Sequence, residues 1–190
     1  MNKKKSFKIY YLLISEGTTE FNLFGYLTTK KFKESFEKSN VQFSIKVEII
    51  EAGISQGKLN GTGNLKSFKG KYNLIKDDDR YKDQKLFFFI DKDFEDFPQI
   101  EVLVRGDGNI IQFVEYNSEY LLLRFAGKNP KSPSDFNNMR DFRGYCKTEF
   151  QKQFNMKASD LKDCDFDFIF RDVSDEEVKT SFSELFSTLS

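Results

Sequence analysis

The chain has 190 residues, a formal net charge of zero, and 16% aromatic residues, with 23 Phe among them. This length suffices for one domain with a buried core, and the aromatic content argues against global disorder. Lys and Arg together number 30, as do Asp and Glu, so the sequence lacks the basic excess of proteins that coat nucleic acid non-specifically.

The sequence contains no His and no Trp, and the absence of His excludes several kinds of catalytic site. Ser-His and Cys-His pairs cannot form within the chain, and neither can zinc sites with His ligands. Cys146 and Cys164 are too few and too far apart for a zinc cluster. They could form a disulfide, but we expect a reduced cytosolic pair. A metal ion must therefore bind carboxylates, which suit magnesium, manganese or calcium.

The N-terminus, Met-Asn-Lys-Lys-Lys, resembles the start of a signal peptide. The apolar run that follows, residues 9–14, is only as long as a strand, and no small-residue cleavage site comes after it. No segment approaches the ~20 apolar residues of a membrane span. We therefore expect a cytoplasmic protein that does not enter a membrane.

The first half of the chain alternates between strand and helix patterns. The predicted elements are a strand over 7–14, a helix over about 19–36, a strand over 43–50, a glycine-rich loop over 53–64, a helix over about 63–76 and a strand over 85–90. The near-continuous apolar strands indicate burial on both faces. This β-α-β-α-β order predicts a parallel sheet with the strands in the order 2-1-3.

The second half mixes further strand and helix patterns. The predicted elements are strands over 100–104 and 109–114 in a hairpin, a short helix capped by Asn117 or Ser118, a long helix over about 135–155, a strand over 160–172, and a last helix that starts at Ser174. We therefore expect an α/β, Rossmann-like parallel sheet flanked by helices over residues 1–126. Residues 127–190 would form a C-terminal α/β extension packed on the same domain.

Acidic side chains follow two strands of the predicted sheet at their carboxyl ends. Glu16 follows the first strand, and Asp91 and Asp93 end the third. Strands one and three are neighbours, so these groups meet in the crevice where such sheets bind ligands. Glu20 starts the first helix, four residues after Glu16, and can turn back over the same spot. Because clustered carboxylates repel one another, a divalent cation is expected between them.

Each acidic motif also has a simpler interpretation when it is taken alone. Asp91-Lys92-Asp93 would more often be a solvated turn than a metal site. Glu16 and Glu20 could merely favour the dipole of the first helix. Their coincidence on strands one and three favours the metal site.

These residues resemble a known family. Glu16-Gly17-Thr18-Thr19-Glu20 after a buried strand, with Asp91-Lys92-Asp93 after a Phe-rich strand, resembles the Toprim domain. More narrowly, it resembles the E-G-x-T-E version of OLD-family nucleases and RloB-like proteins of bacterial antiphage defence. The segment over 61–64, Gly-Thr-Gly-Asn, is similar to one in OLD-type Toprim domains, and the resemblance covers residues 7–125 approximately. It implies magnesium (or manganese) bound by Glu16, Asp91 and Asp93, with Glu20 as an added ligand.

The segment over 117–125 departs from the RloB-like pattern. Those proteins carry a segment resembling N-P-x-F-E-x-W-L-L-L-H-F, where this chain has Asn-Ser-Glu-Tyr-Leu-Leu-Leu-Arg-Phe, with Arg124 in place of His. The resemblance adds Glu119 to the metal ligands. Tyr145-Cys146-Lys147 is similar to a later Tyr-x-Lys, which makes Lys147 a candidate catalytic contact to phosphate. Arg124 or Lys147 would stabilise the charge of the transition state.

Together, the residues and the resemblance predict a magnesium-dependent Toprim endonuclease, a phosphodiesterase that cleaves DNA or RNA as the effector of an antiphage defence system. No ATPase motif is present, and the resemblance implies a separately encoded ABC-type ATPase as partner. The alternative is a catalytically inactive Toprim-like module that senses a nucleotide or phosphate, or that serves as an assembly subunit of an ATPase complex. Receiver-like and haloacid-dehalogenase-like domains fit poorly, because their acidic residues follow different strands. The oligomeric state stays open, a homo-oligomer included.

Overall fold

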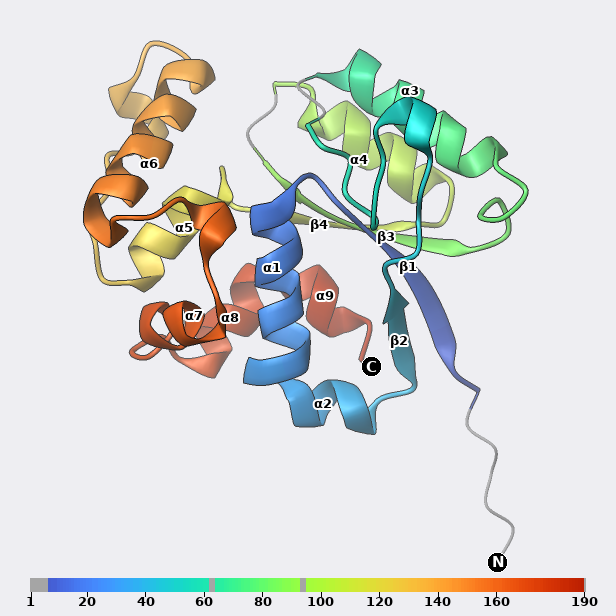
Figure 1. Cartoon of the computed structure of the whole chain (residues 1–190), viewed down its shortest axis with the longest axis horizontal. Coiled ribbons are helices and arrows are strands. Elements are labelled where there is room, and N and C mark those ends of the chain that lie inside the picture. Colours follow the sequence, from blue (N-terminus) through green and yellow to red (C-terminus); the bar gives the residue numbers. More distant parts are fainter. Residues whose placement is uncertain (1–6, 62–63, 93–94, 190) are drawn as a thin grey trace, which may run out of the picture.

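The computed structural model describes residues 7–61, 64–92 and 95–189. These residues form a four-stranded parallel sheet flanked by helices (Figure 1). The strands are β1 (Ile9–Ser15), β2 (Val41–Ser44), β3 (Lys85–Asp91) and β4 (Ile110–Val114), in the order β2-β1-β3-β4. The predicted α/β, Rossmann-like class and the 2-1-3 strand order are confirmed. Phe87, Phe88 and Phe89 of β3 are completely buried, as expected for a central parallel strand.

Helices cover both faces of the sheet (Figure 1). On one face, α3 (Leu65–Asp77) and α4 (Phe97–Gly106) pack against side chains such as Ile14 and Phe88. On the other, α1 (Thr18–Tyr26) and the C-terminal helices share a core with Leu13 and Phe87. The C-terminal part is thus built into the main core.

The remaining helices are shorter, with the exception of α6. They are α2 (Lys33–Lys38), α5 (Ser118–Phe125), α6 (Met139–Phe154), α7 (Asp163–Ile169), α8 (Asp175–Ser181) and α9 (Ser183–Ser187). A π-helical turn spans Leu27–Lys31, and 3₁₀ turns span Ile50–Ala52, Pro133–Asp135 and Ala158–Asp160. Within the described ranges, no helix combines the length and the apolar character needed to cross a membrane.

Residues 100–104 belong to α4, so the predicted strand and hairpin are wrong. β3 and β4 are parallel, and parallel neighbours need a crossover connection, which α4 supplies. Ile100 and Val104 are buried four residues apart, whereas Val102 between them is 73% exposed. A strand would have turned all three to the same face. Pro98, in the first turn of α4, also suits a helix start.

The strand predicted over 160–172 is wrong as well, because these residues contain α7. Phe166, Ile169 and Phe170 are buried at helical spacing, whereas Phe168 is exposed. The rings of Phe166 and Phe170 pack on Tyr26 of α1, with centroid distances of 5.0 and 5.3 Å. This contact with a helix, rather than with a sheet edge, selects the helical periodicity. In its described part, the C-terminal extension is therefore helical and not α/β.

Several element bounds also differ from the prediction. The helix predicted over 19–36 divides into α1, a π-helical turn and α2. At this turn the hydroxyls of Thr28 and Thr29 bond to backbone carbonyls of α1, at 2.9 and 2.8 Å. The second strand ends at Ser44 instead of residue 50, the long helix starts at Met139, and the last helix divides into α8 and α9 at Phe182.

Candidate functional site

The register of the sheet places Glu16 and Asp91 at the same edge. Ser15 of β1 pairs with Phe89 of β3, and the backbone N–H of Glu16 donates to the carbonyl of Phe89 at 3.3 Å. Asp91 ends β3 two residues later, opposite Val114 of β4. Both carboxylates therefore lie at the carboxyl ends of neighbouring parallel strands, where open α/β sheets bind ligands.

The first turn of α1 adds a third carboxylate. Glu20 is the third residue of α1 and is buried. Gly17 precedes the helix and leaves room for this side chain, because a Cβ atom there would lie 3.2 Å from Glu20 Oε2. Among the described residues, no side chain caps the start of α1. The helix dipole and the backbone amides of this first turn therefore favour an anion in front of it.

Ser118 connects Glu20 to Asp91. Its hydroxyl lies 2.9 Å from Glu20 Oε1 and 2.8 Å from Asp91 Oδ1, and its backbone N–H donates to Asp91 Oδ1 at 3.0 Å. Ser118 is completely buried. A hydroxyl has one proton, so it donates to only one of the two carboxylates at a time. The two carboxylate oxygens thus lie within two hydrogen-bond lengths of each other.

The neighbours of Ser118 also line the site. Asn117 caps α5, since its Oδ1 accepts a hydrogen bond from the backbone N–H of Tyr120 at 2.8 Å. Its Nδ2 is buried and, within the described part of the chain, has no hydrogen-bond partner. Glu119, in the first turn of α5, is buried as a fourth carboxylate. An oxygen of a bound ligand would satisfy the amide of Asn117.

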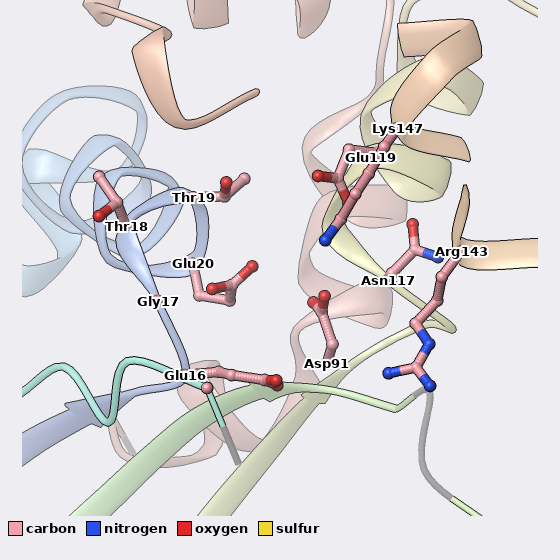
Figure 2. A pocket seen from close by; sticks show the side chains of 11 residues that line it. Glu16, Gly17, Thr18, Thr19, Glu20, Asp91, Asn117, Glu119, Arg143 and Lys147 are labelled. Atoms are coloured by element: carbon pink, nitrogen blue, oxygen red, sulfur yellow. The ribbon is translucent and has the colours of Figure 1, made fainter. Parts of the chain in front are cut away.

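Two cations from α6 face the carboxylates. Phe142, Cys146 and Phe150 form the buried stripe of α6 and fix its orientation. Arg143 and Lys147 each follow a member of this stripe and line the pocket. In Figure 2, Lys147 passes Glu119 and points into the space between α1 and the end of β3, while Arg143 extends along the far side of the pocket.

These side chains surround a pocket of about 240 Å³. Gly61 forms part of its rim, and its backbone N–H donates to the carbonyl of Glu16 at 3.3 Å. Lys71 of α3 holds this rim by donating to the carbonyls of Leu59 and Gly61. Burial lowers the pKa of Lys71, and the charge of Glu16 opposes this shift. Lys71 thus supports the pocket electrostatically as well as by hydrogen bonding.

Most of the residues predicted from the sequence come together here. Those that line the pocket are Glu16, Glu20, Asp91, Glu119 and Lys147. Asp93 lies outside the described residues. Arg124 does not line this pocket, and its guanidinium pairs with Glu115 at 2.7 Å. It is therefore not the cation that faces the carboxylates.

Sequence reasoning missed Arg143 and the bridging role of Ser118. Arg143 lies one helical turn before Lys147, so an i, i+4 pair of cations was an available signal. Asn117 and Ser118 are recognisable from the sequence only as helix-capping residues. Nothing in their spacing indicates that the hydroxyl of Ser118 reaches both α1 and β3.

The carboxylates of the described residues do not form a closed metal site. In the ranges that the structure describes, no group of three or more Asp, Glu or Cys side chains is arranged to hold a metal ion. Glu20 and Asp91 nevertheless fit magnesium or manganese as a pair of hard oxygen donors around the same hydroxyl. Magnesium usually binds through one or two carboxylates and completes its shell with water and substrate phosphates. The donor set suits an ion that is shared with a phosphate ligand.

The pocket thus combines two opposed kinds of binding group. Carboxylates from the sheet edge and from two helix starts would attract a cation, whereas the α6 side chains and the start of α1 would attract an anion. A metal ion together with a phosphate satisfies both. Comparisons of this chain with protein-family models, with curated proteins and with solved structures gave no match.

Proposed function

We propose that this protein is a magnesium-dependent phosphodiesterase of the Toprim type that cleaves DNA or RNA. The proposal depends on one observation, the convergence of carboxylates from β1, α1, β3 and α5 on a pocket that two cations of α6 line from another side. Carboxylates alone would support only cation binding. The opposed cations add a place for the charge of a phosphodiester.

The residues divide into three roles under this proposal. Glu20 and Asp91 would hold the metal ion, which when bound would polarise a phosphoryl oxygen and make water more acidic. Glu16, which the resemblance also names as a ligand, and Glu119 would orient the attacking water and accept its proton. Lys147 and Arg143 of α6 would hold the non-bridging phosphate oxygens and stabilise the negative charge that develops on them.

The biological setting is supported by the resemblance alone. The Glu16–Glu20 and Asp91–Asp93 segments resemble those of OLD-family and RloB-like proteins, which act in antiphage defence. By that resemblance, the protein would be a defence effector that works with a separately encoded ABC-type ATPase. The assay for activity should therefore be run with and without such a partner.

The experiment measures hydrolysis of bis(p-nitrophenyl) phosphate and of labelled single-stranded DNA, double-stranded DNA and RNA, in Mg²⁺, in Mn²⁺ and in EDTA. We expect cleavage that requires metal and that falls at least about a hundredfold in Glu20→Gln and Asp91→Asn. Glu34→Gln is the matched control, because Glu34 is an exposed carboxylate of α2 that pairs with Lys38 at 2.9 Å. Equal loss in the control, or cleavage that persists in EDTA, would contradict the proposed site.

The cations of α6 favour a second candidate, the inactive module. With Arg143 and Lys147 as contacts for an anion, the pocket would bind a nucleotide or phosphate without hydrolysing it. A wild-type protein that phosphate or nucleotides protect against thermal unfolding, but that cleaves no substrate with metal and partner present, would favour this module over the enzyme.

A further inference from the structure

A second cavity continues from the carboxylate pocket along α6. It has a volume of about 370 Å³ and shares Thr19, Glu119 and Lys147 with the first. Gln151, Lys157 and Ser159 line its far part. Because three lining residues are common to both cavities, they form one continuous groove, hereafter the α6 groove.

One wall of the α6 groove is a regular row of hydrogen-bond donors. Arg143, Lys147 and Gln151 follow one another at intervals of four residues, and the buried stripe of α6 turns all of them toward the groove. Four residues advance an α-helix by about 6 Å. This interval is comparable with the distance between successive phosphates of one nucleic-acid strand, so each side chain of the row can meet one backbone unit.

The opposite wall is held in place by α1. Asn22 Nδ2 donates to the carbonyl of Ser159 at 3.1 Å, which ties the 3₁₀ turn Ala158–Asp160 to α1. Ala158, in the same turn, is buried and lines the groove. α6 thus forms one side of the groove and this turn forms the other.

The charge of the groove changes along its length. The first part contains the carboxylates, whereas the second is lined by Lys147 and Lys157, with Glu119 at the junction. An anionic polymer would therefore be held by the second part while one of its phosphates reaches the first. The chain as a whole has no basic excess that would bind a duplex by electrostatics alone.

We propose that the α6 groove holds the backbone of a single nucleic-acid strand that runs away from the carboxylate pocket, so that the substrate is single-stranded. The proposal rests on the proposed function for the identity of the pocket. Gln151 and Lys157 are its distinguishing residues, because they line the groove beyond the carboxylates.

The test measures binding and does not depend on cleavage. Fluorescence anisotropy of a labelled 12-nucleotide oligothymidylate, in EDTA, compares the wild type with Gln151→Glu and Lys157→Glu. We expect the dissociation constant to rise at least about fivefold in each, and Lys157→Gln to lower the salt-dependence slope by about 0.7. Lys152→Glu is the control, because Lys152 is an exposed lysine of α6 that lines neither cavity. Its dissociation constant should change less than that of the groove variants.

Three outcomes would overturn the proposal: unchanged binding in the groove variants, equal weakening in Lys152→Glu, or a duplex that binds as tightly as the single strand. These outcomes are separate from the hydrolysis assays. A protein that binds the single strand through Gln151 and Lys157 but hydrolyses nothing would uphold the groove and refute the phosphodiesterase. A protein that cleaves in magnesium, but whose groove variants bind the single strand as tightly as the wild type does, would uphold the phosphodiesterase and refute the groove.

Discussion

Asp91→Asn tests whether charge repulsion is present in the pocket, because it removes the charge and keeps the shape. Asp91 Oδ1 accepts hydrogen bonds from the hydroxyl and the backbone N–H of Ser118, and an Asn Oδ1 can accept both. A hydrogen bond to a charged group contributes about 1.5–3 kcal/mol and a neutral one about 1 kcal/mol. The substitution therefore costs about 1–4 kcal/mol in weaker hydrogen bonds.

The same substitution removes the repulsion between Asp91 and Glu20. At a separation of about 5 Å and an effective dielectric constant of about 20, two like charges repel by about 3 kcal/mol. The gain and the cost nearly cancel, so we expect the free energy of unfolding of metal-free Asp91→Asn to lie within about 2 kcal/mol of the wild type. Ser118→Ala keeps both charges and loses the hydroxyl, so it should destabilise the protein by about 2–3 kcal/mol.

Urea denaturation in EDTA, followed by circular dichroism because the chain has no Trp, measures both variants. Manganese should raise the urea midpoint of the wild type and leave that of Asp91→Asn nearly unchanged, since only the former keeps the paired carboxylates. If Asp91→Asn loses as much stability as Ser118→Ala, the two carboxylates do not repel in the folded protein. An equal manganese effect on both proteins would remove Asp91 from the metal site.

Three further predictions concern single side chains. Lys147→Ala should slow cleavage by about a hundredfold without changing the melting temperature, because Lys147 is exposed, and Lys152→Ala is its control. Gly57→Ala should lower the free energy of unfolding, measured in urea, by at least about 2 kcal/mol, because Gly57 has a φ of +71° and an added Cβ would clash with the Leu13 carbonyl. Gly53→Ala is its control and should lower this free energy less, because Gly53 has a φ of +66° but open space around it. Burial and the hydrogen bond to Asp167 raise the pKa of Tyr26 above its usual value. The folded protein thus keeps this proton where the unfolded chain has lost it, so stability falls as the pH rises above about 10, and less steeply in Tyr26→Phe.

The parts of the fold that depend on local pattern were predictable. The Phe-rich run of β3 is apolar on both faces, and the 2-1-3 strand order expected of a doubly wound sheet places β1 beside it, which brings Glu16 near Asp91. Residues 100–104 and 160–172 were not assigned correctly because apolar residues at alternate positions over a short stretch fit a strand or one side of a helix. Their partners decided between the two, the parallel strand β4 in one case and Tyr26 in the other.

The candidate site was likewise predictable only where it depends on local pattern and strand order. Carboxylates at strand ends follow from topology, and a lysine on an amphipathic helix follows from periodicity. The hydroxyl of Ser118 between Glu20 and Asp91 depends on how α5 meets α1, and the position of Arg143 depends on how α6 packs. These are distances between elements far apart in the sequence, which single-residue patterns do not encode.

The anchoring of α1 has a consequence for protein synthesis. The Tyr26 hydroxyl donates to Asp167 at 2.9 Å, across a sequence separation of 141 residues. Asn22 donates to the Ser159 carbonyl at 3.1 Å, across a separation of 137 residues. Contacts of such separation form late, because a long loop must close first. A nascent chain that has already made β1, α1 and β3 still lacks the C-terminal surfaces that anchor α1. For the proposed nuclease, we therefore expect a complete pocket only after α6 has been synthesised, because Arg143 and Lys147 line it.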